Sequence, residues 1–264
     1  GRLDHRETQQ PEKPLAISIT GLLEYRQCPA RYYFKHRLGI PEEETFLPTG
    51  AGRAVGAEFG SGVHLMLNMM DLHDDLTAQI EPLSRAAGLH PGTHEEAGRL
   101  LRSFTESALF SELKASQKLY RELPFSMRVG EATLSGAVDA LFLKGDGSWA
   151  MLDYKTDDLG PDDITARAAG YFKQLSLYSL GIERILGFIP RTVMLYFLRP
   201  NVILDKEIGE TELEATEEEA LQLVERIRGE DFPLMKSTRC DGCAYGSTFC
   251  KILEGAGGSS GQTV

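Results

Sequence analysis

Two aspartates and a lysine stand on neighbouring predicted strands in the middle of this 264-residue chain. Asp139 ends the segment GAVD, and Asp153 and Lys155 lie in LDYKT. Because side chains alternate along a strand, Asp153 and Lys155 share one face, and Asp139 would lie at a comparable height beside them. Converging carboxylates suit a hard cation such as Mg²⁺, and the carbonyl of Tyr154 is placed to add a ligand. The ammonium of Lys155 could hold a water and stabilise charge that develops on a phosphate.

A D-x-K pattern alone is a weak signal, and a surface salt bridge is the plainer explanation. His64, in GSGVH, lies in an otherwise apolar helix, where a lone histidine is more often structural than a ligand. Here it precedes the acidic strands and could supply a metal ligand from the helical side. Gln174 and Tyr178 are four residues apart and so share a helix face, for which ordinary packing is the alternative.

The four cysteines form a second constellation. Cys240 and Cys243 make a C-x2-C pair, Cys250 follows, and Cys28 is far away near the start of the chain. A C-x2-C loop can place two thiolates on one metal, and the other two cysteines would complete a four-thiolate site. The spacing leaves zinc and a 4Fe-4S cluster open, and four unconnected cysteines are the least favoured alternative.

Charge gives mixed information about a nucleic-acid partner. The chain carries a net charge of −11, but residues 205–231 hold eleven acidic residues against three basic ones, a balance of −8. Residues 20–40 have a balance of +3, with Arg26, Arg31 and Lys35 interleaved with aromatic side chains. Such a helix could follow a phosphate backbone and stack on bases. A solvated helix face whose aromatic side chains belong to the core is the alternative.

Helical periodicity dominates the first 120 residues and strand alternation the next part. We expect a disordered or linker segment at 1–16 and a flexible tail at 253–264, flanking a single domain at 17–252. Within the domain, 17–120 is helical, 121–210 forms the catalytic sheet core, and 211–252 holds an acidic helix and the cysteine tail. The acidic helix either faces solvent or docks a partner. The predicted helices are about 20–38 (capped by Ser18 or Thr20), 52–72, 93–119, 162–187 and 211–229. The predicted strands are 121–130, 133–143, 148–156, 192–199 and 202–208.

This order predicts an α/β fold with a mixed central sheet flanked by helices. The chain has no apolar run near the roughly 20 residues that a membrane span needs, and no signal-peptide core at its start. We therefore expect a cytoplasmic protein with no membrane partner. In that compartment four cysteines indicate metal or redox chemistry rather than disulfides.

The motifs together resemble the PD-(D/E)xK nuclease superfamily in its RecB-like branch. The matching segments are SITGLLEYRQCPARYYF, GSGVH, GAVD, LDYKT and QLSLY, in the family's order over about 18–250. The resemblance implies a restriction-endonuclease-like core with Mg²⁺ or Mn²⁺. It implies that His64, Asp139 and Asp153 bind metal, with Asp153 as the bridging ligand, and that Lys155 is the catalytic lysine. Gln174 and Tyr178 would support the site or the DNA, and Glu122 matches a glutamate of less certain role.

The cysteines are similar in layout to those of AddB-type helicase–nuclease domains, which place one cysteine in the first helix and three after the core. Cys28–Pro29 matches the first position, whereas the last gap has six residues here and usually five. The resemblance implies a C-terminal iron–sulfur staple, a structural 4Fe-4S cluster on Cys28, Cys240, Cys243 and Cys250. Joining Cys28 to the tail would close a loop of about two hundred residues and so stabilise the fold strongly.

The function that this resemblance implies is metal-dependent hydrolysis of DNA phosphodiesters. We expect an exonuclease that is the nuclease domain of a helicase–nuclease, or a related enzyme of DNA repair and recombination. Because no G-x-x-x-x-G-K-[ST] motif is present in the chain, a helicase domain or subunit is the expected partner beside DNA. The alternative is a non-catalytic DNA-binding or end-guiding module stapled by iron–sulfur or zinc. A zinc-stapled interaction domain is a weaker third interpretation.

Overall fold

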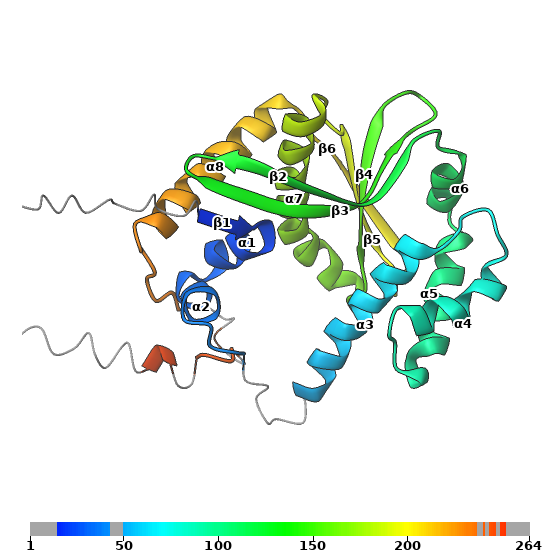
Figure 1. Ribbon diagram of the computed structural model, residues 1–264, viewed down its shortest axis with the longest axis horizontal. Helices are drawn as coiled ribbons and strands as arrows, with labels where there is room; N and C mark the ends of the chain where they lie inside the picture. The colour runs from blue at the N-terminus through cyan, green and yellow to red at the C-terminus, as the bar shows by residue number, and fades with distance from the viewer. Residues whose placement is uncertain (1–14, 43–49, 237–239, 241–242, 247–248, 252–264) are drawn as a thin grey trace, which may run out of the picture.

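The protein, seen here as a computed structural model, is built on one mixed six-stranded sheet (Figure 1). The structure describes residues 15–42, 50–236, 240, 243–246 and 249–251. The sheet order is β1-β3-β4-β5-β6, and β2 pairs with the other edge of β3. The strands are β1 (Leu15–Ser18), β2 (Leu119–Val129), β3 (Ala132–Leu143), β4 (Trp149–Lys155), β5 (Thr192–Phe197) and β6 (Val202–Glu207).

The long strand β3 organises the sheet. One edge of β3 pairs with β2 along almost its whole length in antiparallel register. The other edge has two successive partners, β1 in parallel over Ala132–Ser135 and β4 in antiparallel over Ala140–Leu143. Among the described strand pairs, residues 136–139 therefore have no partner on that edge. The sheet is split at this point, and Asp139 lies at the split.

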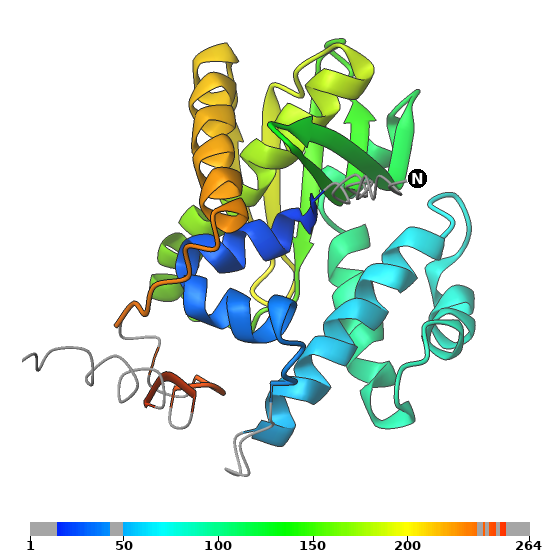
Figure 2. The same ribbon diagram turned by 60° about the vertical axis from the view of Figure 1, so that its left-hand side comes forward.

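Helices cover both faces of the sheet, as Figure 2 shows from the side. One hydrophobic cluster joins β1–β6 to α1, α7 and α8, and a second joins the opposite face to α3–α6. Strands β4 and β5 are parallel and are connected through α7, the usual crossover of α/β proteins. The helices are α1 (Ile19–Gln27), α2 (Pro29–Tyr32), a π-helical turn (Tyr33–Arg37), α3 (Gly50–Met69), α4 (Leu76–Ala86), a 3₁₀ turn (Pro91–Thr93), α5 (His94–Thr105), α6 (Ala108–Ala115), α7 (Pro161–Leu186) and α8 (Glu210–Arg228).

The predicted elements from 121 onward agree with these bounds to within about two residues, and Ser18 caps α1 as expected. Three predictions were wrong. Residues 15 and 16 are not linker, because they form β1 against β3; residues 1–14 and the tail at 253–264 lie outside the described residues. The helix expected at 20–38 is interrupted at Cys28, whose backbone is extended. The helix expected at 93–119 is two helices, and α4 was missed.

The acidic helix α8 packs against its own chain. Leu213, Ala220, Val224 and Ile227 are buried in the main core. Its carboxylates pair with neighbouring elements, for example Glu219 with Lys173 at 2.9 Å and with an arginine of α1 at 2.5 Å. The excess acid of this segment is thus partly neutralised within the domain. Separately, no described helix is long and apolar enough to span a membrane.

Candidate active site

Asp139 lies at the split in the sheet, where its carboxylate contacts the backbone of β4 and a side chain of α3. Its Oδ2 accepts a hydrogen bond from the backbone N–H of Tyr154 at 2.8 Å. The same oxygen lies 3.3 Å from Nδ1 of His64. The carboxylate is fixed by the strand beside it and by the helix that crosses it, so it is held without depending on a flexible loop.

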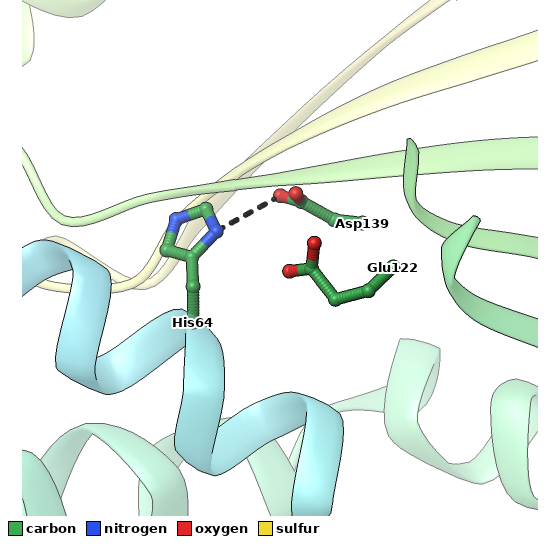
Figure 3. A group of neighbouring side chains, drawn as sticks. All are labelled: His64, Glu122 and Asp139. Carbon is green, nitrogen blue, oxygen red and sulfur yellow. Dashed lines mark ion pairs between the residues drawn. The ribbon is translucent and has the colours of Figure 1, made fainter. Parts of the chain in front are cut away.

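His64 projects from α3 toward the sheet, as Figure 3 shows. Burial opposes a charge on its imidazole, but the carboxylate of Asp139 outweighs burial and raises the pKa of His64. Helix α3 can come this close because Gly60, one turn earlier, has no side chain. A Cβ on Gly60 would lie 2.8 Å from Oγ1 of Thr156, at the end of β4. The glycine of GSGVH therefore sets the distance between helix and strand.

Glu122 is the third member of the cluster in Figure 3. Its ligand atoms, together with those of His64 and Asp139, all lie within 4.8 Å of one another. Glu122 has a φ of 47°, which is uncommon for a residue with a side chain and marks a local break in β2. Burial and the nearby carboxylate of Asp139 raise its pKa. The resemblance to the nuclease family marked Glu122 as a glutamate of less certain role. Only the structure places it beside His64 and Asp139.

Asp153 and Lys155 form a buried ion pair on β4. Asp153 is 4% exposed, and its Oδ2 lies 2.6 Å from Nζ of Lys155. Apart from this ion pair, the buried Oδ2 of Asp153 has no hydrogen-bond partner. Burial raises the pKa of Asp153 to about 6, against the opposing effect of Lys155 and with help from Asp139. The pKa of Lys155 is also raised, because the attraction of Asp153 exceeds the cost of burial.

Helix α7 supplies Gln174 and Tyr178, which share one helix face as predicted. Nε2 of Gln174 donates to the hydroxyl of Tyr178 at 2.6 Å. Burial, with the negative charge of Asp153 and Asp139 nearby, raises the pKa of Tyr178 to about 12. Tyr178 approaches the sheet over Gly136 of GAVD, where a Cβ would lie 2.9 Å from its ring. The pair closes one side of the site with polar atoms that stay neutral.

The donor set fits a hard divalent cation. The ligand atoms of His64, Glu122 and Asp139 are gathered at one point, burial raises the pKa of the carboxyls of Glu122 and Asp153, and the buried Oδ2 of Asp153 has no partner except Lys155. Three carboxyls face the single ammonium of Lys155, and a divalent cation would stabilise their charged forms. The structure thus brings the predicted ligands His64 and Asp139 together and adds Glu122, while Asp153 lies outside this group, close by on β4 and paired with Lys155.

The basic residues near the start of the chain are paired with acidic residues, and the aromatic rings between them are buried. Arg26, Arg31 and Lys35 each pair with a glutamate, at 2.5, 2.7 and 2.6 Å respectively. The aromatic rings of Tyr25, Tyr32 and Phe34 are buried rather than exposed for stacking. These three rings are therefore not exposed for stacking on bases, and contact of this segment with DNA stays a prediction.

The four cysteines line one pocket of about 350 Å³ between α2 and the tail. Figure 1 shows the described part of the tail returning beside α2. The walls are apolar at Ala30 and Leu234 and basic at Arg31, Lys236 and Lys251. Sγ of Cys28 accepts a hydrogen bond from the backbone N–H of Arg31 at 3.4 Å. Tyr245 fastens the tail by donating to the carbonyl of Ile40 at 2.8 Å.

A split mixed sheet whose carboxylates and lysine meet a histidine from α3 defines an α/β protein with a nuclease-type acidic centre. The sequence profile of the PD-(D/E)XK nuclease superfamily matches residues 16–251. The chain belongs to this superfamily.

Relatives of known name are much longer than this chain. An ATP-dependent helicase/nuclease subunit from Carboxydothermus hydrogenoformans is 31% identical over 187 residues, which are 63% of this chain and 15% of that protein. The protein of the same name from Pelotomaculum thermopropionicum is 34% identical over 55% of this chain and 13% of its own length. A solved structure from Eubacterium rectale, 12% identical with a TM-score of 0.50 over 93% of each chain, shares the fold.

Proposed function

We propose that this domain is a divalent-metal-dependent deoxyribonuclease that hydrolyses DNA phosphodiesters, acting as an exonuclease. The observation that carries the proposal is the cluster of His64, Glu122 and Asp139 beside the buried Asp153–Lys155 pair. DNA and a helicase partner are inferred from the names of the helicase/nuclease relatives, of which this chain matches only a small part. The exonuclease assignment is supported by a fold neighbour that is itself named only as a candidate exonuclease.

The residues that would hold the cation are His64, Glu122, Asp139 and Asp153, with the carbonyl of Tyr154. A divalent cation supplies charge neutralisation at phosphate and lowers the pKa of a water. In the reaction a water gives up a proton to solvent as its oxygen bonds to phosphorus. The bond from phosphorus to the leaving oxygen breaks, and that oxygen takes a proton from solvent.

Lys155 has the clearest role among the chain's own groups. Its raised pKa keeps it an ammonium at neutral pH, so it can donate to the attacking water and to a phosphate oxygen as negative charge develops. Asp139 fixes the imidazole of His64 and is itself held by the backbone of β4. Gln174 and Tyr178 limit the access of bulk water from the side of α7.

We further propose that Cys28, Cys240, Cys243 and Cys250 hold a 4Fe-4S cluster with a structural role. All four cysteines line one cavity of about 350 Å³. Basic side chains around the cavity and the N–H donated to Cys28 suit an anionic iron–thiolate cluster. A brown protein with iron and sulfide would support the cluster, and a colourless protein with bound zinc would contradict it.

The protein is proposed to act in the cytoplasm.

The decisive experiment is cleavage of end-labelled linear DNA, single- and double-stranded, with Mg²⁺ or Mn²⁺ and with EDTA. Lys155→Ala should lower the rate by at least about a thousandfold while the protein stays folded. Lys173→Ala is the matched control, because this lysine pairs with Glu219 on the outside of α7. A closed circular substrate should resist an exonuclease. If cluster-loaded wild type cuts no DNA with either metal, the non-catalytic DNA-binding module becomes the better interpretation.

A further inference from the structure

The ring of Tyr171 packs against the ammonium of Lys155, which also pairs with Asp153. Nζ of Lys155 lies 4.2 Å from the centre of the Tyr171 ring, and the lysine side chain is only 13% exposed. A cation over an aromatic face is attracted by the ring's quadrupole, most strongly where water is excluded. The ammonium is therefore held by two partners, a carboxylate and an aromatic ring.

The ring itself is anchored by its hydroxyl. Tyr171 donates to Asp157, whose two carboxylate oxygens lie 2.9 and 3.1 Å away. Nε of Arg167 donates to the same hydroxyl at 3.3 Å, and Arg167 also reaches Asp157 at 3.7 Å. Asp157 lies two residues after Lys155, so the segment that carries the lysine also fixes the ring that holds it.

The helix geometry makes this arrangement coherent with the rest of the site. Arg167, Tyr171, Gln174 and Tyr178 are spaced by four, three and four residues, so they line one face of α7. That face runs from the outer end of the site to the buried carboxylates. Tyr171 is thus one helical turn from Gln174, facing the C-terminal end of β4.

We propose that Tyr171 is a positioning residue that holds the ammonium of Lys155 in place through its ring, with Asp157 as the anchor of the ring. The proposal rests on the proposed function. When Asp153 binds a cation, its charge is shared, and its hold on Lys155 weakens. The ring does not bind the cation, so it keeps the ammonium in the site while leaving N–H donors for a phosphate oxygen.

The first test observes the contact directly and needs neither metal nor activity. In protein labelled with ¹³C-lysine, the Hε resonances of Lys155 are identified by their loss in Lys155→Arg. The ring current of Tyr171 should move them away from those of the exposed lysines. The displacement should be smaller but present in Tyr171→Phe, which keeps the ring and loses its anchor on Asp157, and it should vanish in Tyr171→Leu. Phe172→Leu, a change at the next residue of α7 that also packs on the core, should leave it unchanged.

The second test measures cleavage in steady state. Tyr171→Leu should lower kcat by about tenfold with an unchanged KM for DNA, and Tyr171→Phe should recover it to within about threefold. In a Lys155→Ala background, Tyr171→Leu should cause no further loss, because the group that it positions is gone. A purely structural role would give additive losses and a lower melting temperature instead.

The outcomes separate the two proposals. Unchanged Lys155 resonances in Tyr171→Leu, or an additive loss in the double variant, would overturn the role of Tyr171 while leaving a nuclease. A wild type that shows the displaced resonances but cuts no DNA would overturn the proposed function and leave the contact between the two side chains established.

Discussion

The acidic centre and the cysteine pocket are held in place by different means. The carboxylates stand on β2, β3 and β4, in the interior of the domain, and α3 and α7 enclose them. The cysteines lie on an extended residue after α1 and on the tail, fastened by a small cluster of aromatic side chains around Phe34 and Tyr245. The first site rests on the sheet, whereas the second joins two distant parts of the chain.

This difference has an energetic side. The acidic centre contains a buried carboxyl of raised pKa and a glutamate at positive φ, and both features cost stability. A bound cation would stabilise the charged form of the carboxyl. The cysteine pocket adds contacts between chain segments that are otherwise weakly joined. We therefore expect changes in the acidic centre to affect chemistry more than stability, and changes in the pocket to affect stability more than chemistry.

The largest effect is expected at the split of the sheet. Asp139→Asn should lower cleavage by about a thousandfold and Mn²⁺ affinity by about a hundredfold, because it removes a charged ligand and the partner of His64. Isothermal titration and end-labelled DNA measure the two quantities. The melting temperature should change by less than about 3 °C. A collapse of stability instead would show that the centre also supports the fold.

The opposite result is expected in the cysteine pocket. Cys240→Ser should remove the visible absorbance of the cluster and lower the melting temperature by more than about 5 °C, since the long loop is no longer closed. Below that temperature, cleavage should stay within about tenfold of wild type. As the control, both proteins are treated anaerobically with iron and sulfide. This treatment should restore the visible absorbance and the melting temperature of the wild type and should not restore those of Cys240→Ser. Full stability in the absence of colour would contradict the role of a staple.

A smaller effect tests how α3 is set against β4. Gly60→Ala should lower kcat by about tenfold, because the new Cβ meets Oγ1 of Thr156 and displaces His64. Adding Thr156→Ala removes that oxygen and should restore most of the rate. Gly56→Ala on the same helix meets no atom within 4 Å and should be neutral or slightly stabilising. An unrescued double variant would argue against this contact.

The smallest effect concerns pH. The folded pKa of Asp153 is about 6, above its ordinary value, so in the metal-free protein this carboxyl destabilises the fold as the pH rises from about 4 to about 6. Protons compete with the cation for Asp153 and for the other ligands of raised pKa, His64 and Glu122, so the affinity for Mn²⁺ should fall as the pH drops toward 5. The rise in melting temperature that Mn²⁺ produces should be several degrees greater at pH 7 than at pH 5. Equal rises at the two values would exclude Asp153 as a ligand.

Much of the fold could be predicted from the sequence where local pattern was strong. Strands β2–β6 and helices α7 and α8 were found almost at their true bounds, because alternation and helical spacing are local properties. Strand β1 was missed because four residues carry little pattern and are extended only through their pairing with β3. The single long helix expected at 93–119 failed at Ser107 and Ser116, which cap the ends of α6.

The amino-acid sequence by itself determined the chemistry that is available: two aspartates, a histidine, a lysine and four cysteines in an order that resembles one nuclease family. Only the tertiary structure decided which of them meet. It placed Glu122 beside Asp139, set Tyr171 against Lys155, and paired the basic side chains of the first helices with glutamates. The physical reason is that contacts across a split sheet and between distant elements depend on register and helix approach, which no local pattern encodes.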